Sequence, residues 1–123
     1  MSLGAQLSRV LADLQGQCSG IRGTVIATSD GFVLAAAGVL ENETAAATAV
    51  HVTQVVEQHL GLLQPSPYRE QIIWTDNALW YICGLAGTNV MMVLADAHCT
   101  AGMLRMVCRN IGDALNHALA GLD

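Results

Sequence analysis

The stretch VIATSDGFVLAAAG, residues 25–38, consists of two short apolar runs joined at Ser29-Asp30-Gly31. Asp-Gly between apolar runs is among the strongest short signals of a β-hairpin, because these residues tolerate the positive φ angles of tight hairpin turns. Asp30 is the only charged residue in the stretch, which raises the question of a catalytic role. Since the sequence places no histidine or second carboxylate beside it, we interpret Asp30 and Gly31 as structural turn residues.

An amphipathic helix is expected on the N-terminal side of the hairpin. Its apolar positions recur at steps of three and four residues and are Leu3, Leu7, Val10, Leu11 and Leu14. The glycine-rich stretch GQCSGIRG, residues 16–23, ends this helix. The hairpin strands are then expected over residues 23–29 and 32–38.

A second helix is expected over residues 44–63, with Asn42 as its N-terminal cap. One apolar stripe comprises Ala45, Ala49, Val52, Val56, Leu60 and Leu63. Ala46, Val50 and Thr53 lie on a neighbouring arc, so the first half of this helix is apolar over more than one face. A helix that packs only on its own sheet does not need a second face, which favours a subunit contact. The alternative, that alanine is frequent here because of its helix propensity, stays open.

The C-terminal half predicts three further strands and a last helix. Pro65 and Pro67 make residues 64–70 a connection, because proline cannot pair regularly. Apolar runs over residues 71–76, 78–87 and 89–97 are separated by short turns, which indicates an antiparallel meander. These runs are almost continuously apolar, so both faces of the sheet must be covered. The last helix starts near Thr100 and has its apolar positions at Leu104, Val107, Ile111, Leu115, Ala118 and Leu122.

Composition narrows the possible functions. A chain of 123 residues fits one domain, which we place over residues 1–123. Only 12% of the residues are charged and 53% are hydrophobic, which is easiest to accommodate if part of the surface meets another subunit. The five basic residues are all arginines, so Walker-type phosphate loops and Schiff-base chemistry, which need lysine, are excluded. The net charge of −5 argues against nucleic acid as a partner.

No membrane span or bound cofactor is expected either. No apolar stretch approaches the ~18 residues of a membrane span, and the N-terminus lacks the features of a secretory signal, so we expect a cytoplasmic protein. Cys18, Cys83, Cys99 and Cys108 match no close-paired zinc pattern and are interpreted as small buried hydrophobes. His98-Cys99 is a lone pair of soft ligands, so no metal site is expected.

Three segments in this order are informative together: GIRGTVIATSDGFVLAAAG (residues 20–38), NALWYICGLAGTNVMMVLAD (residues 77–96) and TAGMLRMVCRNIGDAL (residues 100–115). With the order of the predicted elements, they resemble the roadblock/dynein light chain family, particularly its bacterial members. The resemblance implies an α+β, profilin-like fold of order α-β-β-α-β-β-β-α. In this fold a five-stranded antiparallel sheet carries the second helix on one face and the first and last helices on the other.

The resemblance also implies a homodimer, in which the second helices pack together and the third strands pair edge to edge. On this chain the expected helix contacts are Ala46, Val50, Thr53 and Glu57, and the expected strand contacts are Gln71, Ile72, Ile73, Trp74 and Thr75. Pairing of the third strands would also cover an edge that otherwise invites aggregation.

The function that the resemblance implies is that of a non-enzymatic interaction or regulatory module. Its expected partner is a small Ras-like GTPase or a signalling or motor complex, for which it would serve as regulator or scaffold. Such a module needs no catalytic residue, although an arginine could act in trans as a finger; the candidates are Arg22, Arg69, Arg105 and Arg109. The small number of surface charges departs from the family pattern and leaves open how the domain would bind a GTPase.

The alternative is a small-molecule sensory domain with a ligand cavity between helix and sheet. Such a cavity needs convergent polar groups, and the strands offer Thr75, Tyr81 and Cys83. A hydrolase has no recognisable nucleophile motif in this sequence.

Overall fold

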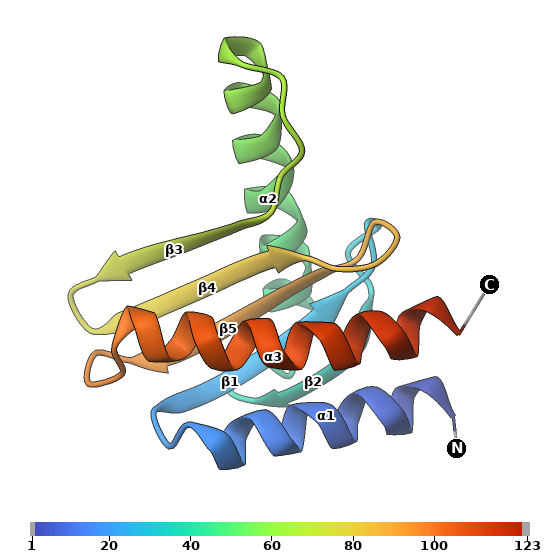
Figure 1. The fold of residues 1–123 in the computed structure, drawn as a ribbon, viewed down its shortest axis with the longest axis vertical. Helices are drawn as coiled ribbons and strands as arrows, with labels where there is room; N and C mark the ends of the chain where they lie inside the picture. Colours follow the sequence, from blue (N-terminus) through green and yellow to red (C-terminus); the bar gives the residue numbers. More distant parts are fainter. Residues whose placement is uncertain (1, 122–123) are drawn as a thin grey trace.

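Within residues 2–121, eight helices and strands follow one another in the predicted order (Figure 1). The computed structural model describes residues 2–121, so the prediction for Leu122 lies outside the described residues. The elements are α1 (Leu3–Gln17), β1 (Ile21–Ala27), β2 (Val33–Gly38), α2 (Glu43–Leu63), β3 (Glu70–Thr75), β4 (Ala78–Gly84), β5 (Val90–Asp96) and α3 (Ala101–Ala120). The predicted boundaries agree with these to within a few residues.

The five strands form one antiparallel sheet of order β2-β1-β5-β4-β3. The β1-β2 hairpin and the β3-β4-β5 meander are joined through β5, which pairs with both β1 and β4. This order places β2 and β3 at the two edges of the sheet. Both the antiparallel meander and the edge position of the third strand are therefore confirmed.

Helices cover both faces of the sheet, as its continuous apolar strands require (Figure 1). One core lies between the sheet and the α1-α3 pair and includes Leu7, Leu11, Leu104 and Leu115. The other lies between the sheet and α2 and includes Ala46 and, from the strands, Val25, Ile82 and Met92. The profilin-like arrangement implied by the resemblance is thus present. No helix within residues 2–121 is both long enough and apolar enough to cross a membrane.

The β1-β2 hairpin closes through a longer loop than a two-residue turn. Gly31 N–H donates to the Thr28 carbonyl at 2.9 Å, and Thr28 N–H donates to the Phe32 carbonyl at 2.9 Å. Gly31 has φ +86°, whereas no residue other than glycine has a positive φ among those described. Asp30 is exposed in this loop. Asp30 and Gly31 therefore lie in the hairpin loop, and only the glycine adopts the left-handed conformation, as in a type I turn closed by glycine.

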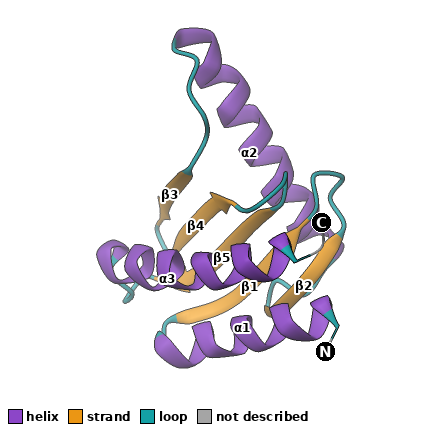
Figure 2. Cartoon of the chain, turned by 45° about the vertical axis from the view of Figure 1, so that its right-hand side comes forward, coloured by secondary structure: helices purple, strands orange, loops and turns teal. Residues whose placement is uncertain are grey.

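The helix α2 extends beyond the sheet that it covers (Figures 1 and 2). It begins at its predicted cap, where the Asn42 side chain accepts a hydrogen bond from Ala45 N–H at 2.7 Å. Its buried residues all lie in the first half, from Ala45 to Thr53. The second half projects past β3, and the connection over residues 64–69 runs back along it to the sheet edge. We call residues 54–63 the α2 overhang.

Candidate interaction site

The β3 strand presents one unpaired edge. It pairs with β4 over its whole length, from Glu70 opposite Cys83 to Thr75 opposite Ala78, and no strand within residues 2–121 lies on its other side. Ile73 and Trp74 are exposed, and 67% of the Trp74 surface is accessible. An edge strand with exposed apolar side chains is a template for pairing with another chain. This edge contains all five strand positions expected at a subunit contact.

The structure corrects the helix positions that were expected at this contact. Ala46, Val50 and Thr53 are buried within the chain, with Ala46 fully inaccessible, while Glu57 is exposed. Ala46 and Val50 belong to the core between α2 and the sheet. The small side chains bring α2 close to its own sheet, so this face is not available to a second subunit. This helix has two neighbouring apolar arcs. The sequence does not show whether the sheet covers one of them or both.

The large exposed apolar residues of α2 lie in the overhang instead. They are Val55, Leu60, Leu62 and Leu63, and the last two are 80% and 85% exposed. Leu60 and Leu63 continue the stripe that was expected to face the sheet, but the sheet ends before it reaches them. A signal for this surface existed in the sequence: the run LGLL, residues 60–63, ends the helix directly before the proline-containing connection.

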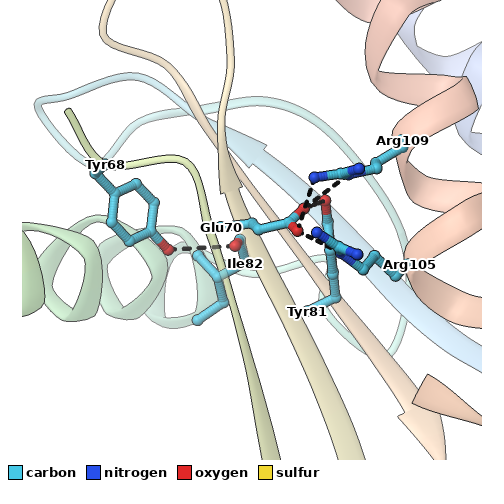
Figure 3. A network of polar contacts seen from close by, with 6 residues as sticks. All are labelled: Tyr68, Glu70, Tyr81, Ile82, Arg105 and Arg109. Atoms are coloured by element: carbon cyan, nitrogen blue, oxygen red, sulfur yellow. Dashed lines mark hydrogen bonds and ion pairs between the residues drawn. The ribbon is translucent and has the colours of Figure 1, made fainter. Parts of the chain in front are cut away.

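A polar network ties the start of β3 to α3 (Figure 3). The Glu70 carboxylate accepts hydrogen bonds from Arg105 Nε at 2.5 Å and from the Tyr81 hydroxyl at 2.6 Å. Arg109 donates two longer bonds to the same carboxylate, at 3.3 and 3.4 Å. On the other side of β3, the Tyr68 hydroxyl donates to the Ile82 carbonyl at 3.2 Å. These contacts connect elements that are far apart in the sequence.

Burial and hydrogen bonding shift the pKa values of this network in predictable directions. Burial acts to raise the Glu70 pKa, but the bonds from Tyr81, Arg105 and Arg109 outweigh it and hold the pKa below its ordinary value. Burial, and then the bond to the Glu70 carboxylate, raise the Tyr81 pKa. Glu70 is thus an ionised anchor and Tyr81 a neutral donor, which is a structural arrangement rather than an acid–base pair.

The four arginines considered as fingers divide into two groups. Arg105 and Arg109 are half exposed and both engage Glu70. Arg22 and Arg69 are exposed, on β1 and immediately before β3. Arg105 and Arg109 therefore have a structural role, which is to hold the Glu70 carboxylate.

A hollow of about 750 Å³ lies around the end of β4, between α2 and α3. Tyr81 and Cys83 line it, as the sensory alternative requires, but Thr75 does not. Some of its polar groups are already hydrogen-bonded: Tyr81 donates to Glu70, and the Tyr68 hydroxyl accepts from Gln71 Nε2, which lies outside the lining, at 2.8 Å. The hollow is open and polar, unlike the mostly apolar enclosure of a typical ligand site.

The cysteines occupy two different environments. Cys18, Cys83 and Cys108 are buried in the core below α1 and α3, as expected, whereas Cys99 is only partly buried; burial raises the Cys83 pKa to about 12. Cys18 and Cys99 are brought together across the chain, with their sulfur atoms 3.1 Å apart. Within residues 2–121, no three histidine, cysteine or acidic side chains gather in a group that could hold a metal ion.

Solved structures show what class of fold this is. No protein-family model and no curated protein matches the sequence. MglB of Myxococcus xanthus superposes with a TM-score of 0.88 at 15% identity, over 98% of this chain and 92% of that one. A Roadblock/LC7 domain from Streptomyces avermitilis superposes with a TM-score of 0.83 at 16% identity, over 92% and 97%.

A profilin also has this architecture. Profilin II of Acanthamoeba castellanii superposes with a TM-score of 0.65 at 12% identity, over 89% of this chain and 95% of that one. The chain therefore has the fold of roadblock/LC7 domains, itself similar to profilin, as the resemblance implied.

Proposed function

We propose that this chain is a single roadblock-type domain that acts in the cytoplasm as a homodimeric, non-enzymatic interaction module. Its proposed partner is a small Ras-like GTPase, or another signalling or motor complex. The observation that carries the proposal is that two apolar surfaces lie at one edge of the sheet: β3 offers an edge with exposed Ile73 and Trp74, and the α2 overhang projects past that same edge with no sheet beneath it (Figures 1 and 2).

Pairing of β3 with a second β3 would satisfy the free backbone groups of both edges. The two sheets would become one continuous sheet, with the exposed Ile73 and Trp74 of each chain at the junction. An antiparallel pairing of two identical strands obeys the two-fold symmetry of most homodimers.

The α2 overhang supports the same arrangement. It projects past β3, on the side where the second subunit would continue the sheet. The second subunit, mainly through the α2 helix of that subunit, would then cover the exposed leucines of the overhang, Leu60, Leu62 and Leu63. The proposed contact therefore keeps Glu57 and the strand residues 71–75, and it replaces Ala46, Val50 and Thr53 with Val55, Leu60, Leu62 and Leu63.

The GTPase part of the proposal rests on the family resemblance together with the fold. The engagement of Arg105 and Arg109 by Glu70 favours a module that lets the partner's own site perform the hydrolysis. The low fraction of charged residues, 12%, fits a mostly apolar contact with the partner.

The dimer is tested by the solution mass from light scattering. The wild-type protein should have the mass of a dimer, and the double variant Leu62→Glu with Leu63→Glu should be a folded monomer by circular dichroism. A matched control is Met103→Glu with Met106→Glu, which places the same charges on exposed residues of α3 on the opposite face of the sheet. A wild-type monomer would overturn the homodimer, and loss of the dimer in the control alone would place the contact elsewhere.

The GTPase partner is tested with purified small Ras-like GTPases encoded in the same genome. Each is loaded with GDP or with a non-hydrolysable GTP analogue and mixed with the wild-type dimer. A complex whose stability depends on the nucleotide supports the proposal, and single-turnover hydrolysis shows whether the module accelerates the reaction. If no GTPase forms a complex with a verified dimer, the partner is of another class.

The second candidate, a small-molecule sensory domain, is favoured by the hollow around the end of β4. Native mass spectrometry of the protein purified from its own host tests it. A retained small molecule, lost in a Tyr81→Phe variant, would move this candidate to first place.

A further inference from the structure

Two cysteines meet at the junction between the end of α1 and the start of α3. Cys18 and Cys99 are 81 residues apart in the sequence, and their sulfur atoms lie 3.1 Å from each other. Both are free thiols in this structure. We propose that this pair is an oxidation site, at which a low-molecular-weight disulfide converts the two thiols into a reversible intramolecular disulfide bond.

Both cysteines are held in place by backbone hydrogen bonds. Cys18 caps the C-terminus of α1, where its N–H donates to the Leu14 carbonyl at 3.3 Å and its carbonyl accepts from Ile21 N–H at 3.1 Å. Cys99 closes the turn after β5, where its N–H donates to the Asp96 carbonyl at 3.1 Å. Cys99 also directly precedes Thr100, the N-terminal cap of α3. The two thiols therefore face each other from fixed positions.

The turns that carry the two cysteines are themselves joined. Asp96 N–H donates to the Gly20 carbonyl at 2.9 Å, beside the sulfur atoms. A Cβ at Gly20 would lie 3.1 Å from Cys99 Cβ and 3.3 Å from Asp96 Oδ1, so the absence of a side chain at Gly20 permits this close approach. Gly20 is thus a positioning residue for the pair.

Formation of the bond requires little movement. A disulfide has an S–S length of about 2.05 Å, so the sulfur atoms, now 3.1 Å apart, must approach by about 1 Å. Rotation of the two side chains supplies such a displacement while the backbone hydrogen bonds of both turns stay in place. A pair whose backbones pointed apart would instead need a rearrangement of the fold.

The oxidation proceeds by two exchange steps. Cys99 is the more accessible of the two, so its thiolate attacks one sulfur of the oxidant disulfide and displaces the first small thiolate. The Cys18 thiolate then attacks the Cys99 sulfur of this mixed disulfide and displaces the second one. The protein loses two electrons and two protons, and the oxidant becomes two thiols. Excess small thiol reverses both steps.

Burial and the neighbouring Cys18 raise the Cys99 pKa to about 12, so thiolate is scarce at neutral pH. The exchange should therefore be slow, which suits a lasting response to the redox state rather than a rapid peroxide sensor. The site lies at the α1-α3 side of the sheet, away from β3 and the α2 overhang, and it does not depend on the proposed dimer.

The experiment uses the folded wild-type protein, incubated in glutathione buffers of increasing oxidised fraction, then alkylated and analysed by intact mass and peptide mapping. We expect alkylation of only two of the four cysteines, a Cys18–Cys99 crosslinked peptide, full reversal by excess reduced glutathione, and a melting temperature higher by on the order of 5–10 °C. Cys83→Ala, at a buried thiol outside the pair, should behave as the wild type, whereas Cys18→Ser and Cys99→Ser should not form the bond.

Four results would overturn the proposal: a stable glutathione adduct without closure, a crosslink between other cysteines, four free thiols in the most oxidising buffer, or disulfide-crosslinked dimers. The wild-type peptide map decides among these even if a serine variant fails to fold. Crosslinked dimers would show instead that oxidation joins two chains.

Discussion

Arg105 Nε lies 2.5 Å from Glu70 Oε1, which joins the first residue of the edge strand β3 to the last helix. The two residues are 35 positions apart, and Tyr81 on the neighbouring strand donates to the other carboxylate oxygen. Because β3 has a strand on one side only in the described part of the chain, this contact supplies an anchor that a second strand would otherwise provide. The edge is thereby ordered while its outer side stays open.

The Glu70 anchor predicts a loss of stability in acid. Burial opposes ionisation of Glu70, but its hydrogen bonds hold the folded-state pKa below the ordinary 4.5. Its contribution to the free energy of unfolding is thus complete above pH 4.5 and is lost as the pH falls through the lower folded-state pKa. Urea unfolding as a function of pH should show this fall in the wild type and a weaker fall in Glu70→Gln. Glu41→Gln, at an exposed glutamate outside the network, is the control, and identical pH profiles for all three proteins would contradict the assignment.

Gly38 should not tolerate a side chain. It has φ +68°, and an added Cβ would overlap the Arg22 carbonyl oxygen on the paired strand β1. Gly38→Ala should reduce the free energy of unfolding by about 2–4 kcal/mol. Gly112→Ala is the matched control, because nothing lies near its added Cβ and it occupies the interior of α3. That variant should gain up to ~1 kcal/mol in chemical denaturation, and an equal loss in both would refute the steric argument.

Adjacent alanines of α2 should respond oppositely to a charge. Ala46 is fully buried against the sheet, whereas Ala47 is exposed. Ala46→Glu buries an unpaired carboxylate and should lower the free energy of unfolding by more than ~3 kcal/mol. Ala47→Glu should change it by less than about 0.5 kcal/mol. Thermal melts followed by circular dichroism distinguish the two, and a stable Ala46→Glu protein would show that this face of α2 is open after all.

Trp74 should report subunit association through its fluorescence. Its side chain is 67% exposed on the free edge of β3, and pairing of two such edges would remove it from water. Trp80 is the other tryptophan, so a Trp80→Phe variant isolates the signal of Trp74. Its emission maximum should shift to shorter wavelength as concentration rises through the range in which light scattering shows association. Association without a shift would place the contact away from β3.

Disulfide formation between Cys18 and Cys99 should accelerate with pH. The Cys99 pKa is raised to about 12, so its thiolate fraction increases about tenfold per pH unit across the neutral and mildly alkaline range. The rate in oxidised glutathione, measured by quenched alkylation from pH 7 to pH 9, should rise in proportion. The exchange of free N-acetylcysteine with oxidised glutathione under the same conditions calibrates the oxidant. A rate that does not change with pH would show that opening of the junction, not ionisation, limits the reaction.

The sequence by itself determined the local structure of this protein. The Asp30-Gly31 turn, the Asn42 cap and the proline-containing connection after α2 act within a few residues, so their positions could be predicted closely. Continuous apolar strands also required helices on both faces, and the structure has them. The resemblance to the roadblock family added the edge position of β3, which the sheet order confirms.

Only the tertiary structure decided which surfaces are free. The sequence shows that α2 is apolar over neighbouring arcs, but the extent of the sheet beneath it decides that Ala46 is covered and Leu63 is not. The Glu70–Arg105 and Cys18–Cys99 contacts likewise join positions 35 and 81 residues apart. Local propensity carries no information about such pairs, because the packing of whole elements against one another brings them together.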